Sequence, residues 1–169
     1  MGVHRTLGVT GRKATEPPLA GQDDESPLTE QEFREIYAKV PRLTVEVVVQ
    51  SPLGILLTKR AAGPCSGLWH IPGGTVRFGE PLVSAVSRVA GTELGLELEV
   101  GSLLGYIEYP SHYLNGLDSP VGLAFFCNVS HDQVADAGLA RTWFTRPPDP
   151  MHVEQVDFLT AHGLLISDR

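Results

Sequence analysis

Cysteine is scarce in this sequence, which holds only Cys65 and Cys127 among its 169 residues. Two thiols so far apart form neither the framework of a disulfide-stapled domain nor a C-x-x-C metal motif. The sequence therefore predicts one thiol in a loop, Cys65, and one thiol in the core, Cys127.

Basic residues are also few, and long apolar runs are missing. Lys and Arg together number 13 against 20 Asp and Glu, which gives a formal charge of -7. Duplex nucleic-acid binding depends on clustered Lys and Arg, so we expect no nucleic-acid partner. No apolar run reaches the ~18 residues of a membrane span, and the N-terminus lacks the apolar segment of a signal peptide. We expect a cytoplasmic enzyme or binding domain without a membrane partner.

The residues that are present indicate one globular domain behind a polar extension. Residues 1–27 contain "EPPLAGQDDESP". Such a stretch has little to bury, which predicts a flexible N-terminal extension. The chain is 42% apolar and 20% charged, which fits a single domain over residues 28–169. Its first helix is marked by the T-x-x-E capping box of Thr29 and Glu32 and ends at Pro41.

Alternating and helical hydrophobic patterns predict a mixed α/β order. We expect helices over residues 80–94, capped by Gly95, and over residues 149–164. Residues 110–119 are expected to form a loop over a site. Strands are expected at residues 43–50, 55–60, 96–109, 120–129 and 141–145. The inward side chains of the closing helix are expected to be Val153, Val156, Phe158 and Leu159.

The segment "WHIPGGTVRFGEPLVSAVSRVAGTELGL" holds the pattern with the most chemistry. Gly73 and Gly74 let the backbone turn tightly and approach a ligand closely. Glu80 and Glu93 stand at opposite ends of the predicted helix, about 20 Å apart at 1.5 Å per residue. They cannot both bind one ion unless Glu80 belongs to the loop. We therefore expect the glycine backbone and Glu93 to neighbour the ion, with the loop folded back over the helix.

This segment resembles the Nudix box, the loop-helix-loop signature of enzymes that hydrolyse a nucleoside diphosphate linked to another group. The residues in register are Gly74, Glu80, Arg88, Ala90, Glu93, Gly95 and Leu96. The upstream "GILLTKR" and "GLWHIPGG" are also similar to the family, so the resemblance covers roughly residues 43–160. It implies the Nudix fold, an α/β/α sandwich with a central mixed sheet.

Two acids of the box are replaced, by Val89 and Thr92. The resulting ending, "RVAGTELG", resembles the variant box of GDP-mannose mannosyl hydrolase. That resemblance implies one Mg²⁺ ion, or Mn²⁺, held by the carbonyl of Gly73 and the carboxylate of Glu93. This chain departs from the subgroup in having Thr75 in place of an Arg. Its loop "HDQVADAGL" holds His131 and Gln133, but not as the subgroup's Gln-His pair.

The loss of acids bears on which bond is cleaved. Attack at phosphorus benefits from several cations around an already anionic centre. Attack at the anomeric carbon of a sugar instead releases the diphosphate, whose charge needs one Mg²⁺ ion and an Arg or two. The water then needs a separate general base. The reduced box is therefore compatible with carbon attack and less so with phosphorus attack.

The residue types and the resemblance together nominate a site. An alternative role for Arg88 is structural: it would hold Glu80 or the loop in place and would not contact the substrate. His152 and His162 are expected at the surface of the closing helix. The candidate catalytic residues are Glu93, Arg88 and His112, the candidate substrate-binding residues are Arg60, His70, Gly74 and Tyr109, and the candidate metal ligands are Gly73, Glu93 and Glu80.

Three functions are compatible with these features. The first is an Mg²⁺-dependent hydrolase of a nucleoside diphosphate derivative, such as a GDP-sugar. The second is a pyrophosphohydrolase that cuts between phosphates. The third is a non-catalytic Nudix domain that binds a nucleotide or a partner. The resemblance also implies a possible homodimer.

Overall fold

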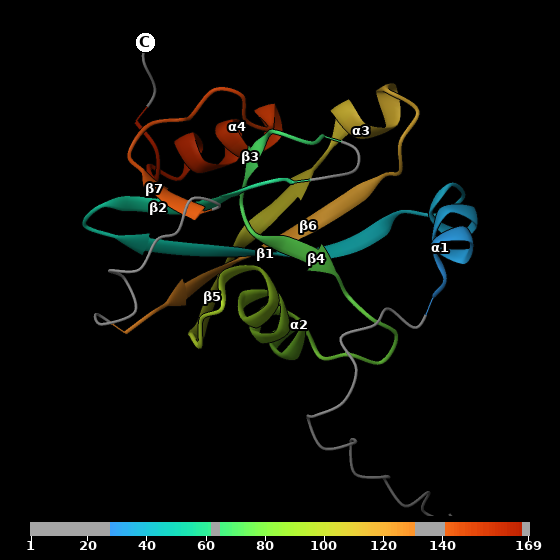
Figure 1. The fold of residues 1–169 in the computed structure, drawn as a ribbon, viewed down its shortest axis with the longest axis horizontal. Helices are drawn as coiled ribbons and strands as arrows, with labels where there is room; N and C mark the ends of the chain where they lie inside the picture. Colours follow the sequence, from blue (N-terminus) through green and yellow to red (C-terminus); the bar gives the residue numbers. More distant parts are fainter. Residues whose placement is uncertain (1–27, 62–64, 131–140, 167–169) are drawn as a thin grey trace, which may run out of the picture.

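The computed structural model describes residues 28–61, 65–130 and 141–166. The predicted extension 1–27 and the residues His131 and Gln133 lie outside this part (Figure 1). In chain order the elements are α1 (Glu30–Tyr37), β1 (Arg42–Ser51), β2 (Gly54–Lys59), β3 (Trp69–His70), β4 (Gly73–Thr75), α2 (Leu82–Val89), the π-helical turn η1 (Ala90–Leu94), β5 (Glu99–Glu108), α3 (Pro110–Leu114), β6 (Pro120–Asn128), β7 (Arg141–Phe144) and α4 (Val153–Ala161).

The strands form one mixed sheet around β1. Its main order is β3-β2-β1-β6-β5, with β4 paired to β1 and β7 paired to β2. β1 runs parallel to β6 from the pair Arg42–Pro120 to the pair Val49–Cys127, and the other pairings are antiparallel. Because both faces of a central strand are covered, residues 44–49 of β1 are all buried.

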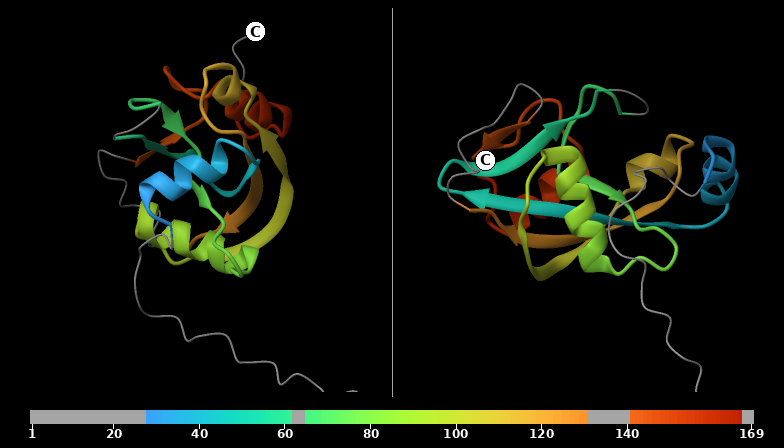
Figure 2. Two further views of the ribbon diagram at one scale, coloured as in Figure 1. Left: turned by 90° about the vertical axis from the view of Figure 1, so that its right-hand side faces the viewer. Right: turned by 60° about the horizontal axis from the view of Figure 1, so that its bottom comes forward.

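Helices cover both faces of this sheet. α2 lies below the strands in Figure 1 and α4 lies above them, and the right-hand view of Figure 2 shows α2 crossing in front of the sheet. Side chains alternate along β1, so Val45 and Val47 pack in one cluster with Val86 of α2, while Val48 packs with Leu159 of α4. The predicted α/β/α sandwich with a central mixed sheet is confirmed.

The box helix is shorter than the sequence predicts. α2 covers Leu82–Val89, and the π-helical turn η1 continues it to Leu94, where Gly95 caps the end with a φ of 61°. The predicted cap is confirmed, but Glu80 precedes the helix and belongs to the loop. π-helical turns often occur at functional sites, and this one carries Glu93.

The closing helix differs from the prediction in two ways. Val153 was expected to face inward, yet it is 58% exposed. His152 was expected at the surface, yet it is 7% exposed and forms the N-cap of α4. Both expectations are wrong because α4 begins at Val153, which places His152 and Gln155 against the sheet. His162 is exposed, as predicted.

We predict that Leu159→Ala lowers the free energy of unfolding by about 2–5 kcal/mol, because Leu159 is fully buried and the change leaves a cavity. Val153→Ala on the same helix should change it by less than about 0.5 kcal/mol, since Val153 is exposed. Urea unfolding of both variants measures the difference. Equal losses would show that α4 does not pack as described.

Candidate functional site

The site begins with a carboxylate that two glycines enclose. Glu46 of β1 is 5% exposed and lies between Gly73 of β4 and Gly122 of β6. A Cβ atom on Gly73 would lie 2.3 Å from Oε2 of Glu46, and one on Gly122 would lie 2.6 Å from Oε1. Neither position accepts a side chain without displacing this carboxylate, so glycine at both positions provides the space that the carboxylate occupies.

A buried hydrogen-bond chain holds Glu46 from the side of α4. The backbone N–H of Ile71 donates to Oε1 of Gln155 at 2.8 Å, which turns the Gln155 amide nitrogen toward Tyr109. That nitrogen donates to the Tyr109 hydroxyl at 2.9 Å, and the hydroxyl donates to Oε1 of Glu46 at 3.0 Å. Thr44 donates to the same oxygen at 3.1 Å. The chain links α4, the end of β5 and the centre of β1.

Glu46 is electrically unusual. Burial raises the pKa of Glu46 to about 8, although the hydrogen bonds from Tyr109 and Thr44 lower it, and the nearby charge of Glu93 raises it further. Because Oε1 already accepts two hydrogen bonds, the proton of the neutral form belongs on Oε2, which faces Gly73. Burial also raises the pKa of the Tyr109 hydroxyl, so this hydroxyl remains a donor.

Glu93 lies at the end of the box helix, next to Gly73. Gly73 and Gly74 belong to the short strand β4, so the predicted tight turn at these two glycines is wrong. Residue Glu93 is exposed, yet the protein atoms around its carboxylate raise its pKa by desolvation, against a hydrogen bond from the backbone N–H of Gly73 and the charge of Arg60. The loop therefore folds back onto the end of the box helix, as expected. The structure brings Gly73 and Glu93 together through the amide of Gly73.

The residues that replace the two missing acids bring no carboxylate to the two glycines. Val89 is 2% exposed, and its methyl group would lie 2.8 Å from a Cβ on Gly74. The Thr92 hydroxyl donates to the helix carbonyls of Arg88 and Val89 at 3.0 and 3.2 Å. Among the acids of the box, Glu93 alone interacts with Gly73 of β4 in the described part of the chain.

Arg88 ties the loop to the helix. Its guanidinium donates to both carboxylate oxygens of Glu80, at 2.7 and 2.9 Å, and to the carbonyl of Thr75 at 3.0 Å. The hydrogen bonds from Arg88, larger in effect than partial burial, lower the pKa of Glu80. This geometry favours the alternative in which Arg88 holds Glu80 and the loop.

His112 of α3 is oriented by an acid. Its Nδ1 donates to Oδ1 of Asp118 at 3.1 Å, while Arg42 donates to the other oxygen. Burial would raise the pKa of Asp118, but the hydrogen bonds from His112 and Arg42 lower it to about 2, so Asp118 is ionised. Nε2 of His112 is thereby left as a proton acceptor. Arg42 also donates to the Thr75 hydroxyl at 2.9 Å, so β1 supplies a guanidinium beside position 75.

Two further histidines line the site as neutral groups. Nδ1 of His70 donates to the carbonyl of Ile71 at 2.9 Å, which leaves Nε2 to accept from Thr58 at 3.4 Å. Burial lowers the pKa of His70, and burial together with the charges of His112 and His70 lowers the pKa of His152 to about 4. Both rings are therefore neutral near pH 7.

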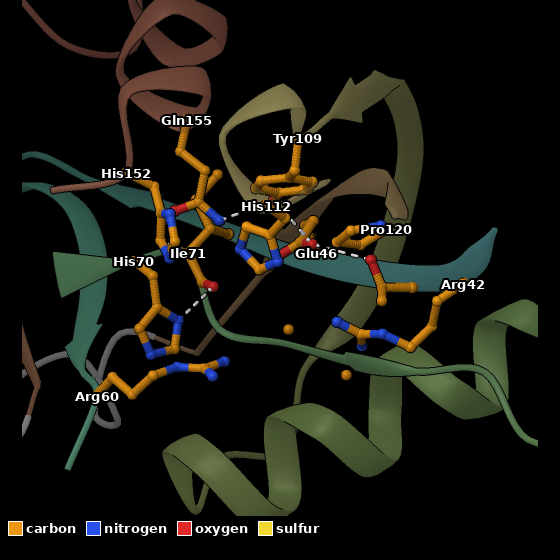
Figure 3. Close-up of a pocket in the computed structure, with 13 residues that line it drawn as sticks. Arg42, Glu46, Arg60, His70, Ile71, Tyr109, His112, Pro120, His152 and Gln155 are labelled. Atoms are coloured by element: carbon orange, nitrogen blue, oxygen red, sulfur yellow. Dashed lines mark hydrogen bonds between the residues drawn. The ribbon is translucent and has the colours of Figure 1, made fainter. Parts of the chain in front are cut away.

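These side chains surround a cavity of about 60 Å³ (Figure 3). That volume suits a few water molecules rather than a nucleobase. A larger groove of about 690 Å³ adjoins it, lined by α1 and by the segment after α3, and shares Arg42, Arg60 and His112 with the cavity. The cavity is lined by Arg42, Thr44, Glu46, Arg60, His70, Ile71, Gly73, Gly74, Tyr109, His112, Pro120, His152 and Gln155.

Most of the nominated residues meet at this cavity, and several lining residues were not nominated. Glu80, Arg88 and Glu93 are not in its lining, although Glu93 contacts it through Gly73. Glu46 could have been found from the sequence, because it is an acid inside the apolar run "TVEVVV". The lining residues named above that were nominated from sequence are Arg60, His70, Gly73, Gly74, Tyr109 and His112.

The residues around Gly73 offer the donor type that a hard divalent cation takes. The donors are oxygens, from the Glu93 carboxylate and from backbone carbonyls of β4 such as that of Gly73, and Mg²⁺ prefers oxygen ligands. In the structure it is the N–H of Gly73 that interacts with Glu93. The charge of Glu93 adds to burial in raising the pKa of Glu46. A cation bound at Glu93 would offset that contribution.

Comparison with known proteins identifies relatives. A model of the NUDIX domain family matches residues 40–162. The chain is 37% identical over 107 residues to the low-salt glycan biosynthesis protein Agl8 of Haloferax volcanii, covering 62% of this chain and 69% of that protein. It is 39% identical over 70 residues to an ADP-ribose pyrophosphatase of Methanocaldococcus jannaschii, covering 41% of each.

A solved structure of a Nudix hydrolase is similar to this chain. The crystal structure of a MutT Nudix hydrolase from Burkholderia pseudomallei superposes with a TM-score of 0.60 at 28% identity, covering 72% of this chain and 97% of that one. Within the described residues, no helix combines the length and the apolar character needed to cross a membrane.

We predict that Glu46 makes stability fall as pH rises from about 4.5 to about 8. The folded protein keeps the Glu46 proton up to about pH 8, whereas the unfolded chain releases it near 4.5, so the folded state binds more protons in that window. Glu46→Gln imitates the protonated form and should flatten the decline.

The measurement is urea unfolding of both proteins from pH 6.5 to 8.5, and the contribution of the buried histidines, which both proteins share, cancels in the comparison. Glu99→Gln, at an exposed position of β5, is the control and should keep the wild-type slope. Parallel pH curves for wild type and Glu46→Gln would show that Glu46 is not protonated in the folded protein.

Proposed function

The chain belongs to the Nudix family of hydrolases, and from that premise we propose that it hydrolyses a nucleoside diphosphate sugar, such as a GDP-sugar, with Mg²⁺ as cofactor. Nudix hydrolases act on nucleotide derivatives with divalent metal ions. The observation that carries the finer proposal is the reduced box. Glu93 is the one acid of the box beside Gly73, Val89 places a methyl group and not a carboxylate against Gly74, and Thr92 bonds to helix carbonyls.

Glu93 and the carbonyl of Gly73 would hold the Mg²⁺ ion. One carboxylate gives weak affinity by itself, but Mg²⁺ commonly binds through one or two carboxylates together with substrate phosphates. When bound, the ion neutralises charge that develops on the departing diphosphate. Arg60, whose charge acts on Glu93, is placed to bind the same diphosphate.

His112 is the proposed general base. Asp118 fixes its ring so that Nε2 accepts protons, and His112 borders a cavity that suits water. A water oxygen forms a bond to the anomeric carbon while the bond between that carbon and the diphosphate oxygen breaks. The leaving diphosphate keeps the electron pair of that bond, and Nε2 of His112 takes a proton from the water. The products are free sugar and nucleoside diphosphate.

The adjoining groove gives room for the rest of the substrate. It is large enough for a nucleoside or a sugar, and Phe33 and Tyr37 of α1 offer aromatic surface there. Arg42 and Arg60 lie at the junction of groove and cavity, which suits a diphosphate between the two. The groove and the cavity together therefore match a nucleotide with a linked group.

The relatives support two of the candidate functions. The Haloferax volcanii relative is named for glycan biosynthesis, which favours a sugar-linked substrate. The Methanocaldococcus jannaschii relative is an ADP-ribose pyrophosphatase, which favours cleavage between phosphates. His112, which Asp118 orients beside a cavity of the size of a few waters, favours hydrolysis of a nucleotide sugar.

Product analysis separates the candidates. We predict that incubation with GDP-mannose or GDP-glucose plus Mg²⁺ yields free sugar and nucleoside diphosphate, whereas ADP-ribose, whose diphosphate is joined to C5 of the ribose and not to the anomeric carbon, yields neither product. Glu93→Gln should lower this turnover at least ~100-fold, because it removes the charged metal ligand. Glu97→Gln, four residues on and exposed, is the matched control and should retain wild-type activity.

Each other outcome supports a rival. Sugar phosphate with nucleoside monophosphate indicates a pyrophosphohydrolase. No turnover, with nucleotide-dependent thermal stabilisation, indicates a binding domain. Full activity in Glu93→Gln would remove Glu93 from the metal site.

A second prediction concerns the base. His112→Gln should lower kcat by roughly 10²–10⁴ with a smaller effect on KM, because it removes proton transfer rather than substrate binding. His162→Gln, at an exposed position of the same residue type, should leave both constants unchanged. Steady-state kinetics measure this, and an unchanged kcat in His112→Gln would assign the base to another residue.

A further inference from the structure

Three soft or borderline metal ligands come together from separate parts of the chain, and two of them line the cavity. Cys65 lies in the segment between β2 and β3, His112 lies in α3, and His152 precedes α4. One ligand atom of each residue lies within 4.8 Å of the ligand atoms of the other two. The rings of His112 and His152 have centroids 5.5 Å apart with an angle of 35° between their planes (Figure 3).

The donor set differs in kind from the oxygen donors near Glu93. A thiolate with two imidazoles suits Zn²⁺, which takes sulfur and nitrogen ligands, whereas Mg²⁺ prefers oxygen. Three protein ligands leave one tetrahedral position for water or an anion. His112 and His152 line the cavity, so that position opens toward it.

Neighbouring side chains contact the two imidazole rings. Asp118 accepts from Nδ1 of His112, an arrangement that commonly orients a metal-bound imidazole, and leaves Nε2 as the ligand atom. His152 is 7% exposed, and within the described residues its ring contacts are to Tyr109 and His112. Cys65 has a φ of 64°, the one left-handed non-glycine conformation among the described residues.

We propose that Cys65, His112 and His152 form a Zn²⁺ site in the wall of the cavity, with water or an anion as fourth ligand. Binding releases the thiol proton of Cys65 to solvent and forms bonds from Zn²⁺ to the sulfur and to both imidazoles. The thiolate leaves the site with a net charge of +1, and Arg60, whose charge also acts on His152, adds to it. An anionic fourth ligand, such as a phosphate oxygen, is therefore favoured.

Zinc at this site would inhibit hydrolysis, because it takes the lone pair of His112 that accepts the proton from water. This consequence rests on the proposed function, whereas zinc binding itself does not. Cys65 has no role in the proposed hydrolysis. Its thiol could therefore regulate the enzyme through zinc without taking part in the reaction.

Cobalt gives a direct readout of the site. The full chain, freed of metal with a chelator, is titrated with Co²⁺. We expect one equivalent to produce a thiolate-to-Co²⁺ charge-transfer band and tetrahedral visible bands, which Zn²⁺ then removes. Cys65→Ser should lose the charge-transfer band and weaken Zn²⁺ binding at least ~10-fold.

Two controls test where the metal binds. Cys127→Ala should keep the band, since Cys127 is 1% exposed in the core and outside the cluster. Glu93→Gln should also keep it, because Glu93 serves the separate Mg²⁺ site. A wild-type protein without the band, or a band that persists in Cys65→Ser with the fold intact by circular dichroism, would overturn the zinc site.

Activity forms the second arm of the experiment. With Mg²⁺ and nucleotide sugar, Zn²⁺ should inhibit wild type, whereas Cys65→Ser should have wild-type turnover and resist inhibition at least ~10-fold. Equal inhibition of both proteins would overturn the regulatory role. If no nucleotide sugar is turned over, the proposed function fails, and the cobalt spectrum still decides on the zinc site.

Discussion

The buried carboxyl group of Glu46 constrains much of this structure. A buried carboxyl group is tolerated only with hydrogen-bond partners, and here Tyr109, Thr44 and, through Tyr109, Gln155 provide them. The same group leaves no room for a side chain at Gly73. The glycines of β4, the position of α4 and the cavity are therefore parts of one arrangement. Because Gly73 in turn contacts Glu93, the buried network also determines where the retained acid of the box meets the loop.

The sequence predicted the elements whose patterns are local. The capping box of Thr29 and Glu32, the glycine cap at Gly95 and the central strands are confirmed, because each depends on neighbouring residues alone. The roles of Glu46 and Gln155 could not be predicted in the same way. Their partners lie on other elements, and only the packing of α4 on the sheet brings them together. For the same reason the burial of His152 was predicted wrongly.

The two ends of the cavity have different chemistry. Toward the glycines of β4, oxygen donors and the charge of Glu93 suit Mg²⁺ and a diphosphate. Toward α3 and α4, imidazoles and one thiol suit proton transfer or Zn²⁺. His112 belongs to the second group and faces the first, which makes it the residue through which zinc and hydrolysis would compete. The Nudix box has lost two acids, but other titratable side chains line the cavity beside it.

The identity of the attacked atom tests this account most directly. Hydrolysis of the best nucleotide sugar is carried out in water enriched in heavy oxygen, and the products are analysed by mass spectrometry. Attack at the anomeric carbon places the heavy oxygen in the released sugar and leaves the nucleoside diphosphate unlabelled. Heavy oxygen in a phosphate group would contradict the account, because it would mean that the reduced box still directs water to phosphorus.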